Sequence, residues 1–314
     1  MKLSILIPTY NRSKFLLKNL ESLKSFIFKL KKFHEIEIIV SNNCSTDNTD
    51  QIITSYLDNY PDLKLRYFSQ NKNIGLQKNA LFVLNEAQGE YIMYLGDDDF
   101  LEFSYLKGVV EYIQTNTNVH CIIPSFVAIN TSGESLEGGR DFNFANKLTK
   151  GGFYNCFINS WRGHQLSGLV LKREGLYDSY ITHKVNNIYL FIYFVAYSCL
   201  HGNTYHFTKF PVKVTQPGQE NKDWGYGKDG LLNEVFDNYK KLNVNLLQKG
   251  LLQLYFYTKQ SWRLEYYENL GPKGFFNAFY CIWFSKNSTF FFRLFFPFVG
   301  LLVYFYRKMK NILN

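Results

Sequence analysis

Short apolar runs alternate with amphipathic runs over the first 130 residues, and this alternation constrains the fold more than any other feature. Runs with the length and composition of buried strands lie at 4–7, 35–40, 65–68, 91–95 and 121–127. Segments with apolar residues at helical spacing separate them, at 13–27, 49–57, 77–86 and 104–114. This order predicts an α/β fold with a mostly parallel, doubly wound sheet.

Polar loops follow three of the predicted strands, at 8–12, 41–47 and 96–99. In a doubly wound sheet, ligands bind beyond the carboxyl ends of the strands. We therefore expect these three loops to converge on one pocket.

The sharpest of the three loops contains the acids Asp97, Asp98 and Asp99. Adjacent carboxylates at the end of a buried strand repel one another, so another group must offset that cost. A divalent cation is one such group, because oxygen ligands suit Mg²⁺ or Mn²⁺, and the cation can also bridge to a diphosphate. The alternative is an acidic turn that caps the helix beginning near Ser104.

The other two loops carry groups that suit a nucleotide. Pro8, Thr9, Tyr10 and Arg12 offer a rigid turn, an aromatic face for a base and a cation for phosphate. The loop 41–47 offers donors and acceptors for a base edge or a ribose. Ordinary turn and helix-cap chemistry explains each loop equally well when it is taken alone.

Charge and composition exclude several classes of protein. The formal charge of +9 points to an anionic partner, but the basic residues are dispersed without a nucleic-acid-binding module, so nucleic acid is not expected. No glycine-rich turn follows the first strand, which argues against a dinucleotide-dependent oxidoreductase. The five cysteines are scattered, and the apolar run before Pro8 is too short for a secretory signal, so we expect a cytoplasmic protein without disulfides or structural zinc.

Four motifs in register resemble glycosyltransferase family 2, especially the members that build bacterial capsule and O-antigen polysaccharides. They are Ile-Pro-Thr-Tyr-Asn-Arg at 7–12, Val-Ser-Asn-Asn-Cys-Ser-Thr-Asp-Asn-Thr at 40–49, Asn-Ile-Gly with Lys-Asn-Ala at 73–80, and Tyr-Leu-Gly-Asp-Asp-Asp at 94–99. The resemblance is strong over 1–130 and weaker over 131–230. It implies a GT-A fold, an inverting reaction, and a nucleoside-diphosphate sugar used with Mn²⁺ or Mg²⁺.

The resemblance also implies a domain organisation. Residues 1–130 would form the nucleotide-sugar-binding half, and 131–230 the acceptor-binding half with a lid loop at 216–230. The remaining 231–314 reads as a helical region that associates with a membrane.

Carried over position by position, the resemblance implies roles for individual residues. Pro8, Thr9 and Tyr10 would line the base pocket, with Arg12 nearby. Asn42 stands where the family usually has an aspartate that binds uracil, and its amide oxygen can accept the same bond. Residues expected along the ribose, the diphosphate and the metal are Asn73, Gly75, Lys78, Asp97 and Asp98, with Asp99 as direct metal ligand and Asp97 as a second candidate ligand.

The expected catalytic base is missing from its usual place. Where inverting members carry a carboxylate, this chain has Asn186 and Asn187. An acceptor hydroxyl needs a base within hydrogen-bond reach, and the nearest candidates are Asp178 and His183, with Glu174 and His164 further off. A catalytically weak or inactive module that binds sugar nucleotide or glycan is therefore the alternative function.

Aromatic residues in the second half suit sugar recognition, because an aromatic ring stacks on the apolar face of a pyranose. Trp161, His164 and Trp224 are the candidates for acceptor binding and for the lid. Core packing or loop anchoring is the alternative for each.

The C-terminal segment 290–306 has seventeen residues and one charge, Arg293. It is short for a membrane crossing, and its aromatic residues are of the kind that settle at the lipid–water boundary. Arg307, Lys308 and Lys310 follow it and would attract anionic headgroups. We expect peripheral attachment to the inner face of the cell membrane and a glycan or lipid-linked glycan acceptor; core-packing helices or a dimer interface are the alternatives.

Overall fold

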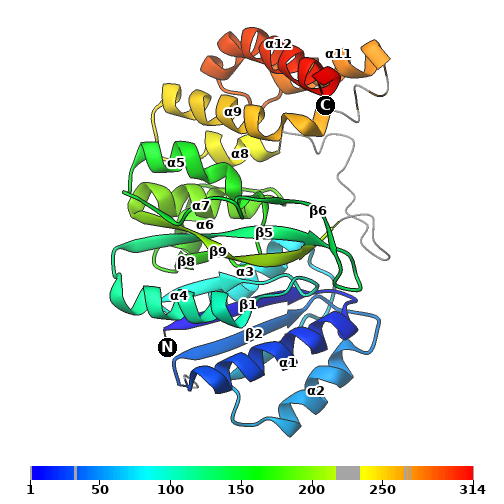
Figure 1. Cartoon of the computed structure of the whole chain (residues 1–314), viewed down its shortest axis with the longest axis vertical. Helices are drawn as coiled ribbons and strands as arrows, with labels where there is room; N and C mark the ends of the chain where they lie inside the picture. Colours follow the sequence, from blue (N-terminus) through cyan, green and yellow to red (C-terminus); the bar gives the residue numbers. More distant parts are fainter. Residues whose placement is uncertain are drawn as a thin grey trace. The chain divides into compact units, whose positions relative to one another are not determined.

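The computed structural model of the chain describes residues 2–31, 34–216, 234–264, 267, 269 and 271–313. Strands and helices alternate through the first part, as the sequence predicts (Figure 1). The elements are β1 (Leu3–Thr9), α1 (Ser13–Leu30), β2 (Ile36–Asn42), α2 (Thr49–Asn59), β3 (Leu65–Ser69), α3 (Leu76–Glu86), β4 (Tyr91–Tyr94) and α4 (Phe103–Thr115).

The rest of the chain adds strands, short helices and a C-terminal group of helices. The strands are β5 (Val119–Ile129), β6 (Ser135–Arg140), β7 (Lys147–Thr149), β8 (Val170–Lys172) and β9 (Asn203–Thr215). The helices between them are α5 (Phe153–Asn159), η1 (Ser160–His164), α6 (Leu176–Thr182) and α7 (Leu190–His201). After β9 come α8 (Val235–Lys240), α9 (Leu246–Gln260), η2 (Ser261–Leu264), α11 (Gly271–Trp283) and α12 (Phe290–Leu313).

One nine-stranded sheet runs in the order β3-β2-β1-β4-β8-β5-β9-β7, with β6 paired to β5. The ladders of β1 with β2 and β4, of β2 with β3, and of β5 with β9 are parallel, whereas β8 is antiparallel to both of its neighbours. The expected α/β architecture is therefore confirmed. In the β1–β2 register, Thr9 pairs with Asn42, so the loops after both strands leave the same edge of the sheet.

Helices cover both faces of the parallel part of the sheet. Leu3, Ile5 and Ile7 of β1 share one core with residues of α1, α2 and α4. Successive strand residues point to opposite faces, and α3 packs on the other face, where Tyr94 donates a hydrogen bond to the Ala80 carbonyl over 2.8 Å. Burial of these apolar faces against the sheet is the main stabilising contribution.

The chain divides into two compact units. The first contains the whole sheet and comprises the chain up to Asn155, Gln165–Ser179 and the chain from Ser198 through β9. The second comprises Cys156–His164, Tyr180–Tyr197 and the helices from α8 onward. It has a core of its own, in which the largest fully buried rings include Phe236, Tyr239, Phe256, Tyr257, Phe292 and Phe296.

Candidate functional site

The three acids follow β4 in a tight turn that we call the acid loop, Gly96–Asp99, and the side chain of Asn19 holds this loop. The Asn19 amide nitrogen lies 2.9 Å from the Asp97 carbonyl oxygen, 2.8 Å from the Asp99 carbonyl oxygen and 3.3 Å from that of Gly96. Asn19 is buried on the same face of α1 as the apolar core residues. The sequence interpretation missed it, although a polar residue on an apolar helix face was the available signal.

The Asp99 carboxylate joins three separate segments of the first unit. Its Oδ2 accepts hydrogen bonds from the Ser167 hydroxyl at 2.5 Å and from the Gln165 amide at 3.2 Å, and its Oδ1 accepts one from the Thr215 backbone N–H at 2.8 Å. A carboxylate has about four lone-pair sites, so these bonds leave at most one. Asp99 is buried, and in these contacts it anchors the acid loop.

Ser167 and Thr215 complete this anchor with their other groups. The Gly96 backbone N–H donates to the Ser167 hydroxyl over 2.9 Å, and the Thr215 hydroxyl donates to the Asp98 carbonyl over 2.5 Å. Neither residue was predicted, because each lies far from the acids in the sequence and no local pattern marks it.

Asp97 faces the loop after β1. The Thr9 hydroxyl donates a hydrogen bond to Asp97 Oδ2 over 2.7 Å. Desolvation and the neighbouring Asp98 carboxylate raise the pKa of Asp97 to about 7, although the Thr9 bond and the Arg12 charge act to lower it. The Arg12 Nε lies 4.0 Å from Asp98 Oδ2, so one cation already faces this acidic turn.

The loops after β1 and β2 are bonded to each other. The Asn11 N–H donates to the Ser45 hydroxyl and the Thr46 N–H donates to Asn11 Oδ1, both over 2.8 Å. The Ser13 N–H donates to Asp47 Oδ2 over 3.1 Å. With the Thr9–Asp97 bond, these contacts bring together the three loops that the sequence predicts to converge.

Tyr10 and Asn42 are placed very differently within these loops. The Tyr10 residue is 42% exposed, so its ring can be reached by a ligand. Asn42 is buried: its Oδ1 accepts from the Ser45 backbone N–H at 3.0 Å and from the Ser45 hydroxyl at 2.5 Å, and its amide donates to the Tyr67 hydroxyl at 3.1 Å. In this arrangement the Asn42 side chain shapes the loop.

The segment before α3 carries the next group of predicted residues. Asn73 Oδ1 accepts from the Asn43 side-chain amide and from the Gly75 N–H, each at 2.9 Å. Gly75 has φ +83°, a conformation that glycine adopts without strain, and it immediately precedes α3. Lys78 is exposed in the first turn of α3. Asn73 and Gly75 thus connect to the β2 loop through Asn43.

The predicted acceptor residues Trp161 and His164 lie in the second unit. Their rings stack with centroids 5.8 Å apart, and the Arg162 guanidinium lies 4.7 Å from the Trp161 ring. Lys259 of α9 lies 5.8 Å from the same ring. Trp224, with nearly all of the predicted lid, falls outside the described residues.

The base candidates are dispersed over both units. Asp178 is exposed on α6 in the first unit, whereas in the second unit His183 Nδ1 lies 2.9 Å from the Tyr193 hydroxyl. Asn187 is buried in a reciprocal pair with Asn238, with two amide contacts of 3.1 Å, which is a structural role.

A carboxylate that the sequence interpretation did not consider lies beside Asn186. Asp237 Oδ2 of α8 accepts the Asn186 backbone N–H over 3.2 Å and pairs with Lys241 over 2.9 Å. These two contacts indicate that Asp237 holds the segment around Asn186 in place.

The acid loop suits a divalent cation only in part. Within the described ranges, no group of three or more His, Cys, Asp or Glu side chains is arranged to hold a metal. Mg²⁺, however, is usually held by one or two carboxylates together with waters and substrate phosphates. The carboxylates of Asp97 and Asp98, adjacent in one turn, are donors of the kind such a cation takes when a diphosphate completes its coordination.

Comparison with known proteins gives a consistent family match. The family model described as glycosyl transferase family 2 matches residues 4–166. The chain is 33% identical over 121 residues to the abequosyltransferase RfbV of Salmonella typhimurium, covering 38% of this chain and 35% of that protein. It is also 33% identical over 172 residues to the GalNAc(5)-diNAcBac-PP-undecaprenol beta-1,3-glucosyltransferase of Campylobacter jejuni, covering 51% and 52%. The chain thus spans about half or less of the length of these relatives.

A solved structure shows the same fold. S. aureus TarS 1–349 in complex with UDP-GlcNAc matches with a TM-score of 0.69 at 17% sequence identity, over 90% of this chain and 81% of that one. This likeness confirms the expected GT-A fold.

Proposed function

The chain belongs to glycosyl transferase family 2, and from this premise we propose that it moves a sugar from a nucleoside-diphosphate sugar, UDP-linked, to a hydroxyl of a glycan or lipid-linked glycan acceptor. The setting we propose is bacterial surface polysaccharide synthesis at the inner face of the cell membrane. The observation that carries the proposal is the convergence of three loops, in which Thr9 bonds Asp97 and Asn11 bonds Ser45. We assign donor binding to the predicted half 1–130 and acceptor binding to 131–230.

The donor would lie along the carboxyl edge of the parallel strands. Tyr10 offers an exposed ring for the base, and Pro8 and Thr9 form the turn beside it. Lys78, with the backbone around Asn73 and Gly75, would face the ribose and diphosphate at the start of α3. A helix N-terminus with a nearby cation is a favourable place for phosphate.

The acid loop would hold the cation and the diphosphate together. Asp98 and Asp97 are the carboxylates that we assign to this contact, with Asp97 also reaching the ribose or sugar. Asp99 as direct ligand stays a prediction, because its bonds to Ser167, Gln165 and the Thr215 N–H leave at most one lone pair for a metal. When bound, Mn²⁺ or Mg²⁺ would supply positive charge against the departing diphosphate.

The transfer itself follows from the substrates. The acceptor oxygen forms a bond to the anomeric carbon, the bond from that carbon to the diphosphate oxygen breaks, and the nucleoside diphosphate leaves with the electron pair. The acceptor proton passes to a base, and attack from the side opposite to the leaving group inverts the anomeric carbon. Asp178 and His183 remain the proposed bases, and Trp161 and His164 the proposed acceptor face.

A second candidate function rests on one observation. At the place where a base is expected, Asn187 is committed to a buried amide pair with Asn238, and neither amide can take up a proton. This supports the alternative of a weak or inactive module that binds sugar nucleotide or glycan.

Nucleotide release separates the two functions. The full chain is mixed with a panel of UDP-, GDP- and dTDP-linked sugars and Mn²⁺, with and without undecaprenyl-diphosphate-linked glycans, and free nucleotide is measured. Acceptor-dependent release with at least one donor supports the transferase. Thermal stabilisation by a donor without release from any donor–acceptor pair supports the binding module.

The base is tested in the same assay with Asp178→Asn and His183→Gln. Loss of the rising limb of the pH–rate profile in one variant, with unchanged donor binding, identifies the base. An unchanged profile in both removes these two residues from the role.

A further inference from the structure

α11 and α12 pack against each other and against α9 within the second unit. The α12 rings Phe292 and Phe296 are fully buried, and Phe296 meets Tyr257 of α9 at 4.9 Å and Phe279 of α11 at 4.5 Å between ring centroids. The Arg307 guanidinium donates to the Ser261 carbonyl over 2.5 Å, so the C-terminal part of α12 is also tied down.

A proline inside α12 strengthens this attachment. Pro297 has no N–H, so the Arg293 carbonyl one turn earlier lacks its helical donor. The indole N–H of Trp283 in α11 donates to that carbonyl over 2.8 Å. The two helices are therefore joined into one hairpin, in which α11 supplies the donor that α12 lacks.

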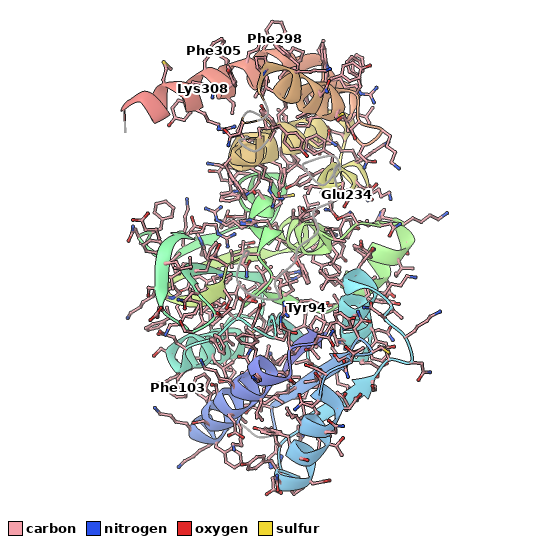
Figure 2. The ribbon with its side chains drawn as sticks, turned by 90° about the vertical axis from the view of Figure 1, so that its right-hand side faces the viewer. Tyr94, Phe103, Glu234, Phe298, Phe305 and Lys308 are labelled. Atoms are coloured by element: carbon pink, nitrogen blue, oxygen red, sulfur yellow. The ribbon has the colours of Figure 1, made fainter. Side chains whose placement is uncertain are left out.

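The opposite side of the hairpin is apolar and uncovered. On α12, Phe290, Phe298, Leu302 and Phe305 are 72%, 71%, 70% and 58% exposed, at a spacing that places them along one side of the helix. On α11 Phe276 and Tyr280 are exposed, and so is Phe284 just after its end, at successive four-residue steps. We call these seven residues the outer stripe; Figure 2 shows Phe298 and Phe305 projecting from α12 on the side away from α9.

The hairpin has a single sign of charge. Between 271 and 313 the sequence contains no Asp or Glu. Its basic residues are Lys273, Lys286, Arg293, Arg307, Lys308 and Lys310. An apolar surface beside basic groups, without acidic ones, complements a surface of hydrocarbon and phosphate.

We propose that the outer stripe docks onto an anionic phospholipid bilayer, with α11 and α12 lying in the plane of the interface. α12 continues to Leu313, beyond the segment 290–306 that the sequence suggested to be short for a crossing, and it has the length and composition of a membrane-crossing helix. A crossing would, however, remove Phe292, Phe296 and Arg307 from their partners in the second unit. A second copy of the chain fits the surface less well, because a two-fold interface would bring basic groups together with no acid in the hairpin to offset them. This proposal deepens the proposed function, since it places the enzyme where a lipid-linked acceptor resides.

Vesicle flotation of the full chain tests the docking. We expect binding to anionic vesicles, made of phosphatidylcholine with about 30 mol% phosphatidylglycerol, and weaker binding to vesicles of pure phosphatidylcholine. Phe298→Ser/Leu302→Ser/Phe305→Ser should weaken binding more than about a hundred-fold. Lys273→Gln/Lys308→Gln should weaken binding to the anionic vesicles about thirty-fold. The matched control is Phe144→Ser, which removes a similarly exposed ring from the first unit and should bind like the wild type.

Donor binding is measured on the same proteins, so that the two proposals fail separately. Wild-type binding of UDP-sugar by the triple variant, with lost flotation, supports the docking. Wild-type flotation by a folded triple variant overturns it, as does a chain that dimerises through the outer stripe and ignores both vesicles. Neither result affects the proposed transfer, which nucleotide release tests.

The depth of the helix distinguishes lying from crossing. A fluorophore is attached to Phe290→Cys, Phe298→Cys or Phe305→Cys after the partly exposed Cys44 and the exposed Cys281 are replaced by serine, and quenching by spin-labelled lipids is measured. A helix in the interface gives the same shallow depth at all three positions. Depth that is greatest at 298 and small at both ends, which lie about 22 Å apart along the axis, would overturn the in-plane arrangement.

Discussion

The bond between Trp283 and the carbonyl freed by Pro297 can be tested with a double-mutant cycle. Trp283→Phe keeps an aromatic ring between α11 and α12 but removes the indole N–H, leaving the Arg293 carbonyl without the donor that it has at 2.8 Å. An unpaired, partly buried carbonyl costs about 1–3 kcal/mol. We therefore expect Trp283→Phe to lower the free energy of unfolding by about 1–3 kcal/mol.

Pro297→Ala supplies the missing N–H from within α12. In that background the Arg293 carbonyl has a helical donor, so Trp283→Phe should cost less by about 1–2 kcal/mol, roughly the value of one hydrogen bond with its desolvation. Pro297→Ala alone should stabilise the protein or leave it unchanged, because proline is unfavourable within a helix.

Guanidinium denaturation followed by far-UV circular dichroism measures all four proteins of the cycle. Trp262→Phe is the matched control, because Trp262 is 56% exposed in η2; it should change the free energy of unfolding by less than about 0.5 kcal/mol. An equal cost of Trp283→Phe in the wild-type and Pro297→Ala backgrounds would refute the idea that Trp283 replaces the helical donor that Pro297 lacks.

Substitutions at three further positions test the first unit. Asn19→Ala removes the amide that contacts the acid loop and should lower the free energy of unfolding by about 2–4 kcal/mol. Asn19→Asp keeps the shape of the side chain but places carboxylate oxygens against carbonyl oxygens, so it should cost more. Denaturation that shows Asn19→Asp to be as stable as the wild type would contradict this. Ser167→Ala leaves Asp99 without its 2.5 Å donor and should cost about 1–3 kcal/mol in the same measurement, whereas no change would exclude the anchor. The Tyr67 hydroxyl donates a hydrogen bond to Asp50, and this bond is the largest cause of the lowered pKa of the Asp50 carboxyl. The stability that the bond contributes is therefore present above about pH 4 and is lost as pH falls through the folded-state pKa. Tyr67→Phe should thus flatten the stability profile below about pH 4. At neutral pH it should cost about 1–3 kcal/mol, mostly because it also leaves the buried Asn42 amide without its acceptor, whereas the exposed Asp50 contributes little. A profile parallel to wild type would show the Tyr67–Asp50 bond to be irrelevant to the pH dependence.

The sequence predicted what depends on local periodicity and on strand direction. The strands at 4–7, 35–40 and 91–95 correspond to β1, β2 and β4, and their parallel pairing brings the loops after them to one edge. Polar runs after buried strands were therefore enough to predict that these loops converge, because the connection rules leave few arrangements of such strands and helices.

The contacts within the site could not be predicted, because they join residues far apart in the chain. Asp99 bonds Ser167 and the Thr215 N–H, and nothing in the local pattern around either partner marks it. The same holds for Asn42, whose amide is used by Ser45 and Tyr67 within the loop. A motif identifies residue types at a site, but tertiary packing decides which of their atoms face a ligand.

Titration calorimetry of UDP into the full chain is the most direct test of the acid loop as a metal-assisted diphosphate site. With Mn²⁺ present we expect binding, and chelation of the metal or the substitution Asp98→Asn should weaken it at least about ten-fold, the value of one charge-assisted contact. Asp98→Asn is preferable to a change at Asp99, because Asp99 also anchors the loop. Equal affinity for UDP with Mn²⁺, with chelator and in Asp98→Asn would contradict the role assigned to the acid loop.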